Sequence, residues 1–563
     1  METEKYVSFT TGSAGDPSKT IHGVNLGGWL VLERYITPYL FALTECDVSE
    51  NPKYHVYPGQ INLPAFLSDG KGENIGPECP PVAGDYPMDQ WTMVEAFPNR
   101  ELARKYLDRH WDTFVTEEDI VRIKNAGITH VRIPVGHWIT GNIEENERYV
   151  TGEWPYLVRA IEWCRKHSIG VWIDLHTAPG SQNGFDNSGR ANQNGPTGTG
   201  WSGSSSNVAR TLEILDEISA QASEDGLSDV VGSFCILNEP FIDTDKDVYR
   251  TFVIDASEIV RRHLPDVTVV IGDTFDAGEF DAATWAIAKN AIRPALLDSH
   301  YYHVFFELAR SFSPRQHIAY VCEHNRKDTQ ACCYDDVEGE EKVPSLINGG
   351  MGRVIGEWSA SYDTLVFVKL DEVMDGIRKD GVAPELDRVI PVDRQKFLQN
   401  FVEAQMVVWE DVPSEGNGVS KGWFYWNFKM EGGAFAEWDF LRGIDEGWIP
   451  KPESNRNAIN RFGSCLDILA RTPDDLSIVH EFPPPVKEAA GANWQAVVAD
   501  DDLVLNHGAS VTTNSDKETP NLEVIHSITF IILSVLVAAI SCRKCLSFKR
   551  KKGGYETTPD LKI

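Results

Sequence analysis

The chain has 563 residues, 42% of them hydrophobic and 10% aromatic, which is enough to bury a large core in one big domain with additions. Its formal net charge of -32 argues against a nucleic-acid partner, because such a partner is bound by a basic face. The same charge suits a soluble enzyme that acts on a neutral ligand, although net charge carries no information about fold.

The cysteines are too sparse for a disulfide scaffold, so each is interpreted from its surroundings. Cys164 and Cys235 lie in apolar helix and strand patterns and are predicted to be buried thiols. The candidates for bridges lie in loop-like segments: Cys46 with Cys79, and Cys322 with Cys332 or Cys333. The sequence leaves these pairings open.

Eight apolar runs between residues 21 and 429 have the pattern of buried strands. They are residues 21–33, which run into a glycine turn, 130–135, 170–176, 234–239, 267–273, 296–305, 353–359 and 422–429. Helical periodicity separates most of them, at residues 116–127, 156–167, 207–222, 247–263, 281–291 and 394–410. The first of these helices opens with a capping box at Thr116 and ends at Gly127.

Three stretches interrupt this alternation. Residues 46–86 are rich in proline and glycine and are predicted to be an insertion, 178–206 form a polar glycine-rich loop, and 312–350 are irregular. Repeated β–α alternation implies a parallel sheet, and eight units fit a closed (β/α)8 TIM barrel over residues 21–470. An open doubly wound sheet is the alternative, but no G-x-G-x-x-G motif opens the first unit.

The two ends of the chain differ from the barrel region. Residues 1–20 are polar and lack the charged start and apolar core of a signal peptide. Residues 471–521 turn from proline-rich to acidic and are predicted to be a linker. Residues 522–542 are predicted to form a C-terminal transmembrane helix near the lower length limit, and the basic tail 543–563 follows at once.

Membrane topology follows from that basic tail. The positive-inside rule places the tail in the cytoplasm, so a single-pass protein with its large domain at the cell surface or in a lumen is expected. The lack of a signal peptide and of any N-x-[ST] glycosylation site opposes this expectation. A tail-anchored protein with a cytosolic domain is the alternative.

The predicted strands end in polar side chains, and in a barrel of parallel strands such ends meet at the active site. One apolar run stops at Asn238 and Glu239 before Pro240, and another stops at Glu357. A carboxylate at the end of a buried strand is unfavourable unless something there needs it. The other strand ends offer Glu33, Arg132, His137, Trp138, His176, His300, Tyr302, Phe305, Trp423, Trp426, Asn427 and Lys429.

The pair Glu239 and Glu357 suits glycoside hydrolysis, because it stands among Arg, His, Tyr and Trp side chains and lacks a metal-ligand cluster. One carboxyl must stay protonated to donate to the leaving oxygen, and the other must stay ionised to attack the anomeric carbon. Arg132, together with His300 and Tyr302, is expected to hold Glu357 ionised by opposite charge and hydrogen bonds.

Aromatic and amide side chains at the strand ends are expected to contact a sugar. Asn238 would bond the 2-hydroxyl, and Trp426 would stack on the apolar face of the ring. Trp358 is also expected to face the ligand. The remaining tryptophans that we assign, namely Trp29, Trp163 and Trp172, are expected in the core.

These motifs, taken in order, make the chain resemble glycoside hydrolase family 5 and, within it, the fungal-type exo-β-1,3-glucanases. The resemblance covers about residues 20–470 and lies at residues 23–33, 36–38, 131–136, 175–176, 178–189, 237–240, 300–305, 356–359 and 422–429. Agreement of many motifs in one order is far more specific than any single motif. The departures are residues 46–86, 326–346 and everything past 480, and the first two leave exo action and linkage open.

The resemblance implies roles for individual residues. It makes Glu239 the acid/base and Glu357 the nucleophile of a retaining double displacement, with the carboxylates about 5–5.5 Å apart. Phe185 and Phe305 would clamp the second sugar. The residues implied for substrate binding at the first sugar are Glu33, Arg132, His176, Asn187, Asn238, His300, Tyr302 and Trp426.

The sequence is compatible with three functions. The first is a glycosidase that cleaves β-1,3-glucan and releases glucose. The second is a β-glucosidase of glycolipids such as steryl glucoside or glucosylceramide, and the third is a glucan-binding surface protein without turnover. No cofactor or metal is expected, because His300 and His303 face opposite sides of a strand. The expected partners are a β-glucoside substrate and the membrane, and the chain is expected to be a monomer.

Overall fold

The computed structural model describes residues 20–476 apart from internal segments, the longest of which are 49–81, 276–291, 327–333, 336–342, 345–351, 381–389 and 411–419. The chain divides into two compact units, Met1–Asn493 and Trp494–Ile563, and the described residues all belong to the first. Within these described residues, no helix has the length and hydropathy to cross a bilayer. The predicted linker after residue 476, the transmembrane helix, the basic tail, most of the insertion and the helix at 281–291 lie outside them.

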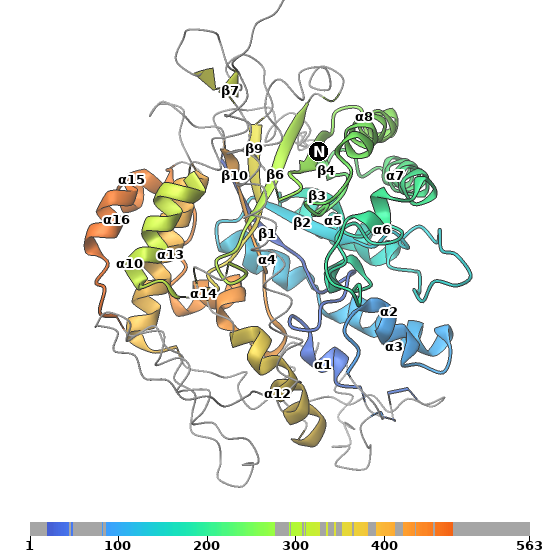
Figure 1. Ribbon diagram of the computed structural model, residues 1–563, viewed down its shortest axis with the longest axis horizontal. Helices are drawn as coiled ribbons and strands as arrows, with labels where there is room; N and C mark the ends of the chain where they lie inside the picture. Colours follow the sequence, from blue (N-terminus) through green and yellow to red (C-terminus); the bar gives the residue numbers. More distant parts are fainter. Residues whose placement is uncertain are drawn as a thin grey trace, which may run out of the picture. The chain divides into compact units, whose positions relative to one another are not determined.

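Eight parallel strands close into a barrel, which confirms the predicted fold class (Figure 1). The strands are β1 (Ile21–Asn25), β2 (His130–Val135), β3 (Gly170–Leu175), β4 (Val231–Cys235), β5 (Thr268–Gly272), β6 (Ala295–Tyr301), β9 (Gly352–Trp358) and β10 (Ser420–Tyr425). Their order around the barrel is β1-β10-β9-β6-β5-β4-β3-β2, and β1 pairs with both β10 and β2.

Helices lie around this barrel, as an alternating β–α chain requires. The longer ones are α3 (Arg100–Thr113), α4 (Glu117–Asn125), α5 (Trp154–Lys166), α7 (Ser205–Glu224), α8 (Lys246–His263), α12 (Leu365–Asp380) and α13 (Val392–Trp409). The capping box predicted at Thr116 is present, since Thr116 and Asp119 each accept a hydrogen bond from the other's backbone N–H. Helices α7 and α8 pack side by side on the outside of the barrel (Figure 1).

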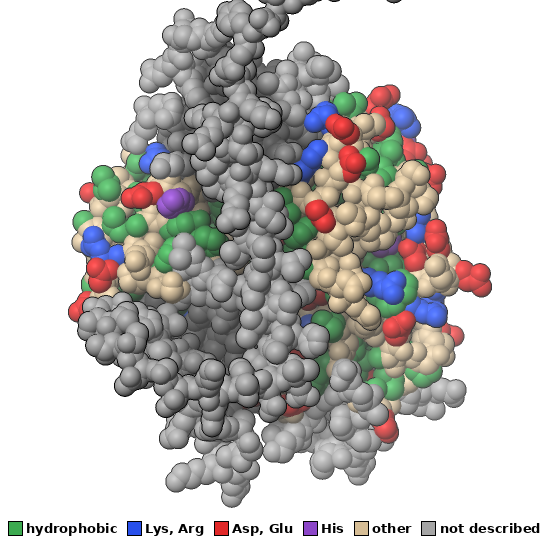
Figure 2. Space-filling view, viewed as in Figure 1, with side chains coloured by type: hydrophobic (Ala, Val, Ile, Leu, Met, Phe, Trp, Pro, Cys, Tyr) green, Lys and Arg blue, Asp and Glu red, His purple; other side chains and the backbone are tan. Residues whose placement is uncertain are grey.

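The barrel interior is filled with side chains. Seven strands contribute one residue each to a buried cluster: Ile21, Trp172, Cys235, Val270, Leu296, Val354 and Phe424. Such layers are what closes a TIM barrel and leaves the C-terminal ends of the strands as the place for chemistry. A larger apolar core joins the outer faces of the strands to the helices. The described periphery of the face in Figure 2 carries interspersed acidic and basic side chains.

Three predicted strands run too far. Strand β4 ends at Cys235, β6 at Tyr301 and β10 at Tyr425, so the polar residues that follow lie on turns beyond the strand ends. Barrel hydrogen bonds continue briefly past β4, because Ile236 N–H donates to Val270 and Asn238 N–H donates to Leu175. Apolar sequence continues where pairing stops because the chain is still buried there.

The prediction that residues 312–350 are irregular is wrong in part. Helix α10 (Pro314–Tyr320) opens with a capping box at Ser313 and continues into the π-helical turn η6 (Val321–Asn325). Two short strands, β7 (Tyr334–Asp335) and β8 (Val343–Pro344), pair antiparallel further on. The polar residues of this stretch masked its capping signal, Ser313 followed by Gln316.

One disulfide joins Cys322 to Cys465 among the described residues. The predicted pairing of Cys322 with Cys332 or Cys333 is therefore wrong, and the bridge instead ties η6 to α16 (Cys465–Arg471) at the end of the barrel domain. Cys46 and Cys79 lie outside the described residues. Cys164 and Cys235 are buried free thiols, as predicted.

Candidate active site

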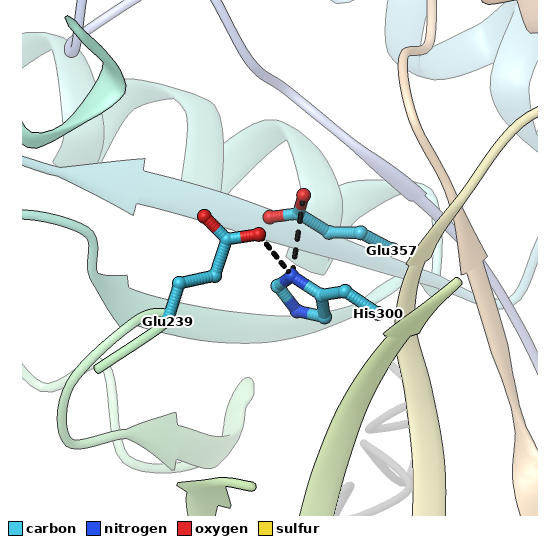
Figure 3. Close-up of side chains that lie close together, drawn as sticks. All are labelled: Glu239, His300 and Glu357. Carbon is cyan, nitrogen blue, oxygen red and sulfur yellow. Dashed lines mark hydrogen bonds and ion pairs between the residues drawn. The ribbon is translucent and has the colours of Figure 1, made fainter. Parts of the chain in front are cut away.

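Two glutamates and one histidine meet where β4, β6 and β9 end (Figure 3). Glu239 lies on the turn after β4, His300 lies near the end of β6, and Glu357 is the penultimate residue of β9. One ligating atom from each residue lies within 4.8 Å of those of the other two. The barrel therefore brings together the two carboxylates that the sequence singled out.

Glu357 receives two hydrogen bonds, one from inside β2 and one from the residue after β6. The Arg132 guanidinium on β2 donates from Nη1 to Oε1 of Glu357 at 2.8 Å, and the Tyr302 hydroxyl donates to Oε2 at 2.8 Å. His300 Nδ1 lies 3.4 Å from the same Oε2. Donors on both oxygens favour the ionised carboxylate, which is the state a nucleophile needs.

Glu239 has a different set of partners. His300 Nδ1 lies 2.8 Å from its Oε1, and the Asn187 side-chain amide donates to Oε2 at 3.0 Å. Its backbone has φ of 47°, in the left-handed region that a non-glycine residue adopts only under local constraint. In this conformation the carboxylate of Glu239 contacts His300.

Arg132 is fully buried beneath this pair and organises it. Its Nη1 also donates to Asn25 Oδ1 at 3.0 Å, and its Nη2 donates to Asn238 Oδ1 at 2.6 Å. Nη2 also lies 3.1 Å from Asp174 Oδ1. A buried guanidinium with several acceptors can compensate more than one carboxylate, and its planar fork fixes their relative positions.

Protonation in this cluster follows from burial and from these neighbours. Burial raises the pKa of Glu239, but His300 and the Asn187 amide outweigh it and bring that pKa down to about 2. Burial, together with the charge of Glu239, raises the pKa of Glu357 above its usual value, although the charges of His300 and Arg132 oppose this shift. Burial lowers the pKa of His300, but the surrounding carboxylates raise it well above its usual value.

The cluster therefore holds a proton on His300, next to Glu239. To act as the acid, Glu239 must carry that proton itself. The proton would then move from His300 Nδ1 to Glu239 Oε1, atoms that lie 2.8 Å apart.

A second group of predicted residues lies at the C-terminal end of the barrel (the mouth), on the side of β1, β3 and β10. Trp426 is 2% exposed, donates from its indole N–H to the Tyr35 hydroxyl at 2.6 Å, and stacks on His176. His176 Nε2 and Glu33 Oε1 are buried and have no hydrogen-bond partner among the described residues. These two atoms are therefore available to hydrogen-bond a polar ligand.

The predicted aromatic clamp consists of two separate clusters. Phe185 packs edge-on against Phe241, and its ring centroid lies 6.5 Å from that of Phe275. Phe305 packs edge-on against Tyr302, whose hydroxyl bonds Glu357, and it is 58% exposed. Both rings thus border the catalytic cluster from different strand ends.

Two expectations about aromatic and histidine residues differ in outcome. Trp358 is fully buried and packs edge-on against Trp423 and Tyr425, so the prediction that it faces the ligand is wrong. The alternation of a strand turns it away from the side that Glu357 faces. His303 is separated from His300 as predicted, and its Nδ1 lies 2.9 Å from Nδ1 of His317.

The structure adds residues that the sequence reasoning missed. Asn25, Tyr35, Asp174 and Asp298 all contact members of the site. A carboxylate inside an otherwise apolar strand, as at Asp174 and Asp298, is the signal that could have found two of them.

Oxygen and nitrogen atoms this close could also ligate a cation. The Arg132 guanidinium already stands 2.8 Å from Glu357 and supplies positive charge there, so the arrangement suits acid–base chemistry better.

Comparison with known proteins agrees with this geometry. The family model described as cellulase (glycosyl hydrolase family 5) matches residues 89–383. A glucan 1,3-beta-glucosidase of Pichia angusta is 31% identical over 79% of this chain and 88% of its own length. One from Yarrowia lipolytica is 31% identical over 79% of this chain and 92% of its own.

A solved structure of similar fold is rutinosidase from Aspergillus niger, with a TM-score of 0.51 and 17% identity over 79% of this chain and 99% of that one. This likeness bears on the fold alone. The family model and the curated relatives lead to one conclusion: the chain belongs to glycoside hydrolase family 5 and is a glycosidase.

Proposed function

We propose that the protein is a retaining, exo-acting β-glucosidase that cleaves β-1,3-glucan and releases glucose. The observation that carries this proposal is the cluster of Glu239, His300 and Glu357 at the strand ends (Figure 3). The glucan 1,3-beta-glucosidases among its relatives support the choice of substrate.

In the first step, Glu357 attacks the anomeric carbon while Glu239 gives its proton to the leaving glycosidic oxygen. Arg132 and Tyr302 hold Glu357 as a carboxylate at the correct position before attack. In the second step, Glu239 takes a proton from water, and the resulting hydroxide displaces Glu357 from the sugar.

Carboxylate spacing supports retention of configuration. Retaining enzymes hold their two carboxyl groups about 5–5.5 Å apart, whereas inverting enzymes leave about 6.5–9.5 Å for a water. The ligating oxygens of Glu239 and Glu357 lie within 4.8 Å of each other, which matches the shorter class.

The direct experiment measures laminarin hydrolysis by the purified chain and two variants, Glu357→Gln and Glu239→Gln. Loss of the nucleophile is expected to lower kcat by more than about 10⁴-fold, and loss of the acid by about 10²–10⁴-fold. Proton NMR of the early product should show the β-anomer of glucose, and oligosaccharides without glucose would contradict exo action.

Glu153→Gln is the matched control. Glu153 is buried and accepts a hydrogen bond from the Trp138 indole at 2.7 Å, away from the catalytic pair. Its substitution should leave kcat near the wild-type value. Unimpaired turnover in Glu357→Gln would reject the mechanism, and a wild-type protein that turns over no β-glucoside would favour a glucan-binding protein.

An exposed apolar rim favours a second candidate, a β-glucosidase of glycolipids. Phe275 is 41% exposed, Phe305 58%, Phe306 40% and Ile242 40%, and all follow the ends of β4, β5 or β6 beside the catalytic cluster. Such a rim could contact an apolar aglycone as well as a sugar face.

Assays with laminarin, a steryl glucoside and a glucosylceramide in parallel would separate the two candidates. Phe305→Ala should raise KM about tenfold for the preferred substrate and change KM little for the others. Preference for a glycolipid with negligible laminarin turnover would overturn the first candidate.

We also propose a single-pass membrane protein whose catalytic domain lies at the cell surface or in a lumen. The disulfide between Cys322 and Cys465 supports this side, because such bonds persist in oxidising compartments. Protease treatment of intact cells should digest the domain. Sealed vesicles with the cytosolic face outward separate the remaining cases, because a lumenal domain should be protected there and the cytosolic domain of a tail-anchored protein should be digested.

A further inference from the structure

Asp298 lies two residues before His300 on β6, and the proposed double displacement does not use its carboxylate. Its Oδ1 accepts the Gly356 backbone N–H at 2.7 Å, and its Oδ2 lies 3.4 Å from His300 Nε2. The carboxylate is 5% exposed. It thus touches both the residue before the nucleophile and the ring beside the acid.

Gly356 shows how closely this carboxylate is fitted. A Cβ at position 356 would lie 2.1 Å from Asp298 Oδ1 and 2.4 Å from Oδ2. Any side chain there would displace the carboxylate, so glycine at this position keeps Asp298 in place next to Glu357.

Both ring nitrogens of His300 face carboxylates. Nδ1 lies 2.8 Å from Glu239, and Nε2 lies 3.4 Å from Asp298. A neutral imidazole has one donor and one acceptor nitrogen, and an acceptor is repelled by a carboxylate oxygen. Either His300 is an imidazolium, or Glu239 carries the proton and donates it to Nδ1 while Nε2–H points at Asp298.

We propose that Asp298 is a positioning residue for the acid step: it keeps a proton on Nε2 of His300, so that Nδ1 shares the catalytic proton with Glu239. This rests on the proposed function. One proton moves from Nδ1 to Glu239 Oε1, leaving a neutral imidazole and a neutral carboxyl, and Glu239 then passes it to the leaving oxygen. The reverse transfer restores the imidazolium after Glu239 has taken a proton from water.

Charges on every neighbouring strand bear on this ring. The groups that face His300 or Asp298 are Glu239 after β4, Asp273 after β5, Glu357 on β9, and Arg132 on β2, which lies 3.9 Å from Asp298. Asp298 is the described carboxylate that contacts Nε2, so its charge acts on that nitrogen more directly than the others do.

The test is Asp298→Asn with two measurements. The amide oxygen can still accept Gly356 N–H, but its NH₂ then faces His300 Nε2 and favours an unprotonated Nε2. Because a nearby negative charge is lost, the proton affinity of the cluster falls, and the pH profile of kcat/KM should shift to lower pH by about one unit.

The second measurement is ¹⁵N NMR of the histidine rings, with His300 assigned from the signal lost in His300→Gln. Wild-type Nε2 should carry a proton at every pH where the enzyme is active, and Asp298→Asn should lose it. This readout needs no substrate, so a failure of the proposed glucanase activity leaves it intact, and the wild-type spectrum decides even if the variant fails to fold.

Asp273→Asn is the matched control. Asp273 is a half-buried carboxylate directly after β5 that accepts hydrogen bonds from the Ser299 hydroxyl at 2.5 Å and from Phe275 N–H at 2.9 Å. Its substitution should shift the pH profile less than half as far. An unprotonated Nε2 in the wild type, or equal pH shifts in both variants, would overturn the proposal.

Discussion

The N-terminal end of the barrel (the base) and its C-terminal end (the mouth) each hold a histidine in contact with carboxylate, but these contacts serve different purposes. Near the N-terminal ends of the strands, His22 Nε2 lies 3.0 Å from Glu410, whose oxygens also accept the Trp423 indole N–H at 3.1 Å and the Ala458 N–H at 2.7 Å. Both oxygens of this carboxylate are occupied by protein donors. The mouth instead places His300 against Glu239, Glu357 and Asp298.

The difference lies in how many carboxylates share one histidine ring. At the base, one histidine meets one glutamate, which locks β1, β10 and α15 (Ala458–Phe462) together. At the mouth, several carboxylates share His300 and Arg132, and Glu33 Oε1 and His176 Nε2 have no partner among the described residues. A single contact between a histidine and a carboxylate stabilises the fold, whereas several carboxylates crowded around one histidine and one guanidinium shift one another's pKa, as the groups of a reactive site do.

The largest effect should come from Arg132→Met, which removes the charge shared at the mouth. It leaves Glu357 and Asp174 buried without their guanidinium, so the free energy of unfolding should fall by about 3–5 kcal/mol. Because Glu357 also loses a charged donor, kcat should fall by about 10²–10³-fold. Urea unfolding and laminarin kinetics on the folded fraction check both numbers. Loss of stability with unchanged kcat would make Arg132 purely structural.

Glu410→Ala is the counterpart at the base and should act on stability alone. Three donors lose their acceptor, so the free energy of unfolding should fall by about 2–3 kcal/mol. Turnover per folded molecule should stay within about twofold of the wild type, since no group of the mouth is touched. A kcat reduced as much as in Arg132→Met would erase the distinction between the two ends.

The smallest effect concerns pH and His130 at the base. Burial lowers the pKa of His130 to about 3, whereas the pKa of a histidine in an unfolded chain is about 6.5. Between these values the unfolded chain binds a proton that the folded chain does not, so stability falls as pH falls, by about 1.4 kcal/mol per pH unit. His130→Asn should remove this contribution when unfolding is followed in urea from pH 7 to pH 5. An unchanged slope would show that His130 is protonated in the folded state.

Much of the barrel could be predicted from sequence because its strands are buried on both faces and its helices are amphipathic. The run ending at Glu239 shows which features could be predicted and which could not. Its position at a strand end was apparent, but the strand ends at Cys235, and the turn beyond takes a positive φ that no local pattern reveals. Strand ends depend on pairing with neighbours that are distant in sequence.

The site was predicted in part for the same reason. Glu357 and Tyr302 end or follow strands, so one rule found both, and the structure brings them within hydrogen-bonding distance. Arg132 is the third residue of β2 and reaches Glu357 from inside that strand. Asp298 lies within a strand, where it contacts His300 two residues further along. Its contact with Gly356 is created only by the register of β6 against β9. The partner of Cys322 is 143 residues away and has no local signal.

The central claim is that Glu357 attacks the sugar while the mouth holds its charge. A 2-deoxy-2-fluoro-β-glucoside with a good leaving group slows breakdown of a glycosyl-enzyme, so the labelled peptide can be identified by mass spectrometry. The label should form on Glu357 in a 1:1 ratio, and activity should be lost in parallel. A label on Glu239, or inactivation without any covalent sugar, would contradict the account.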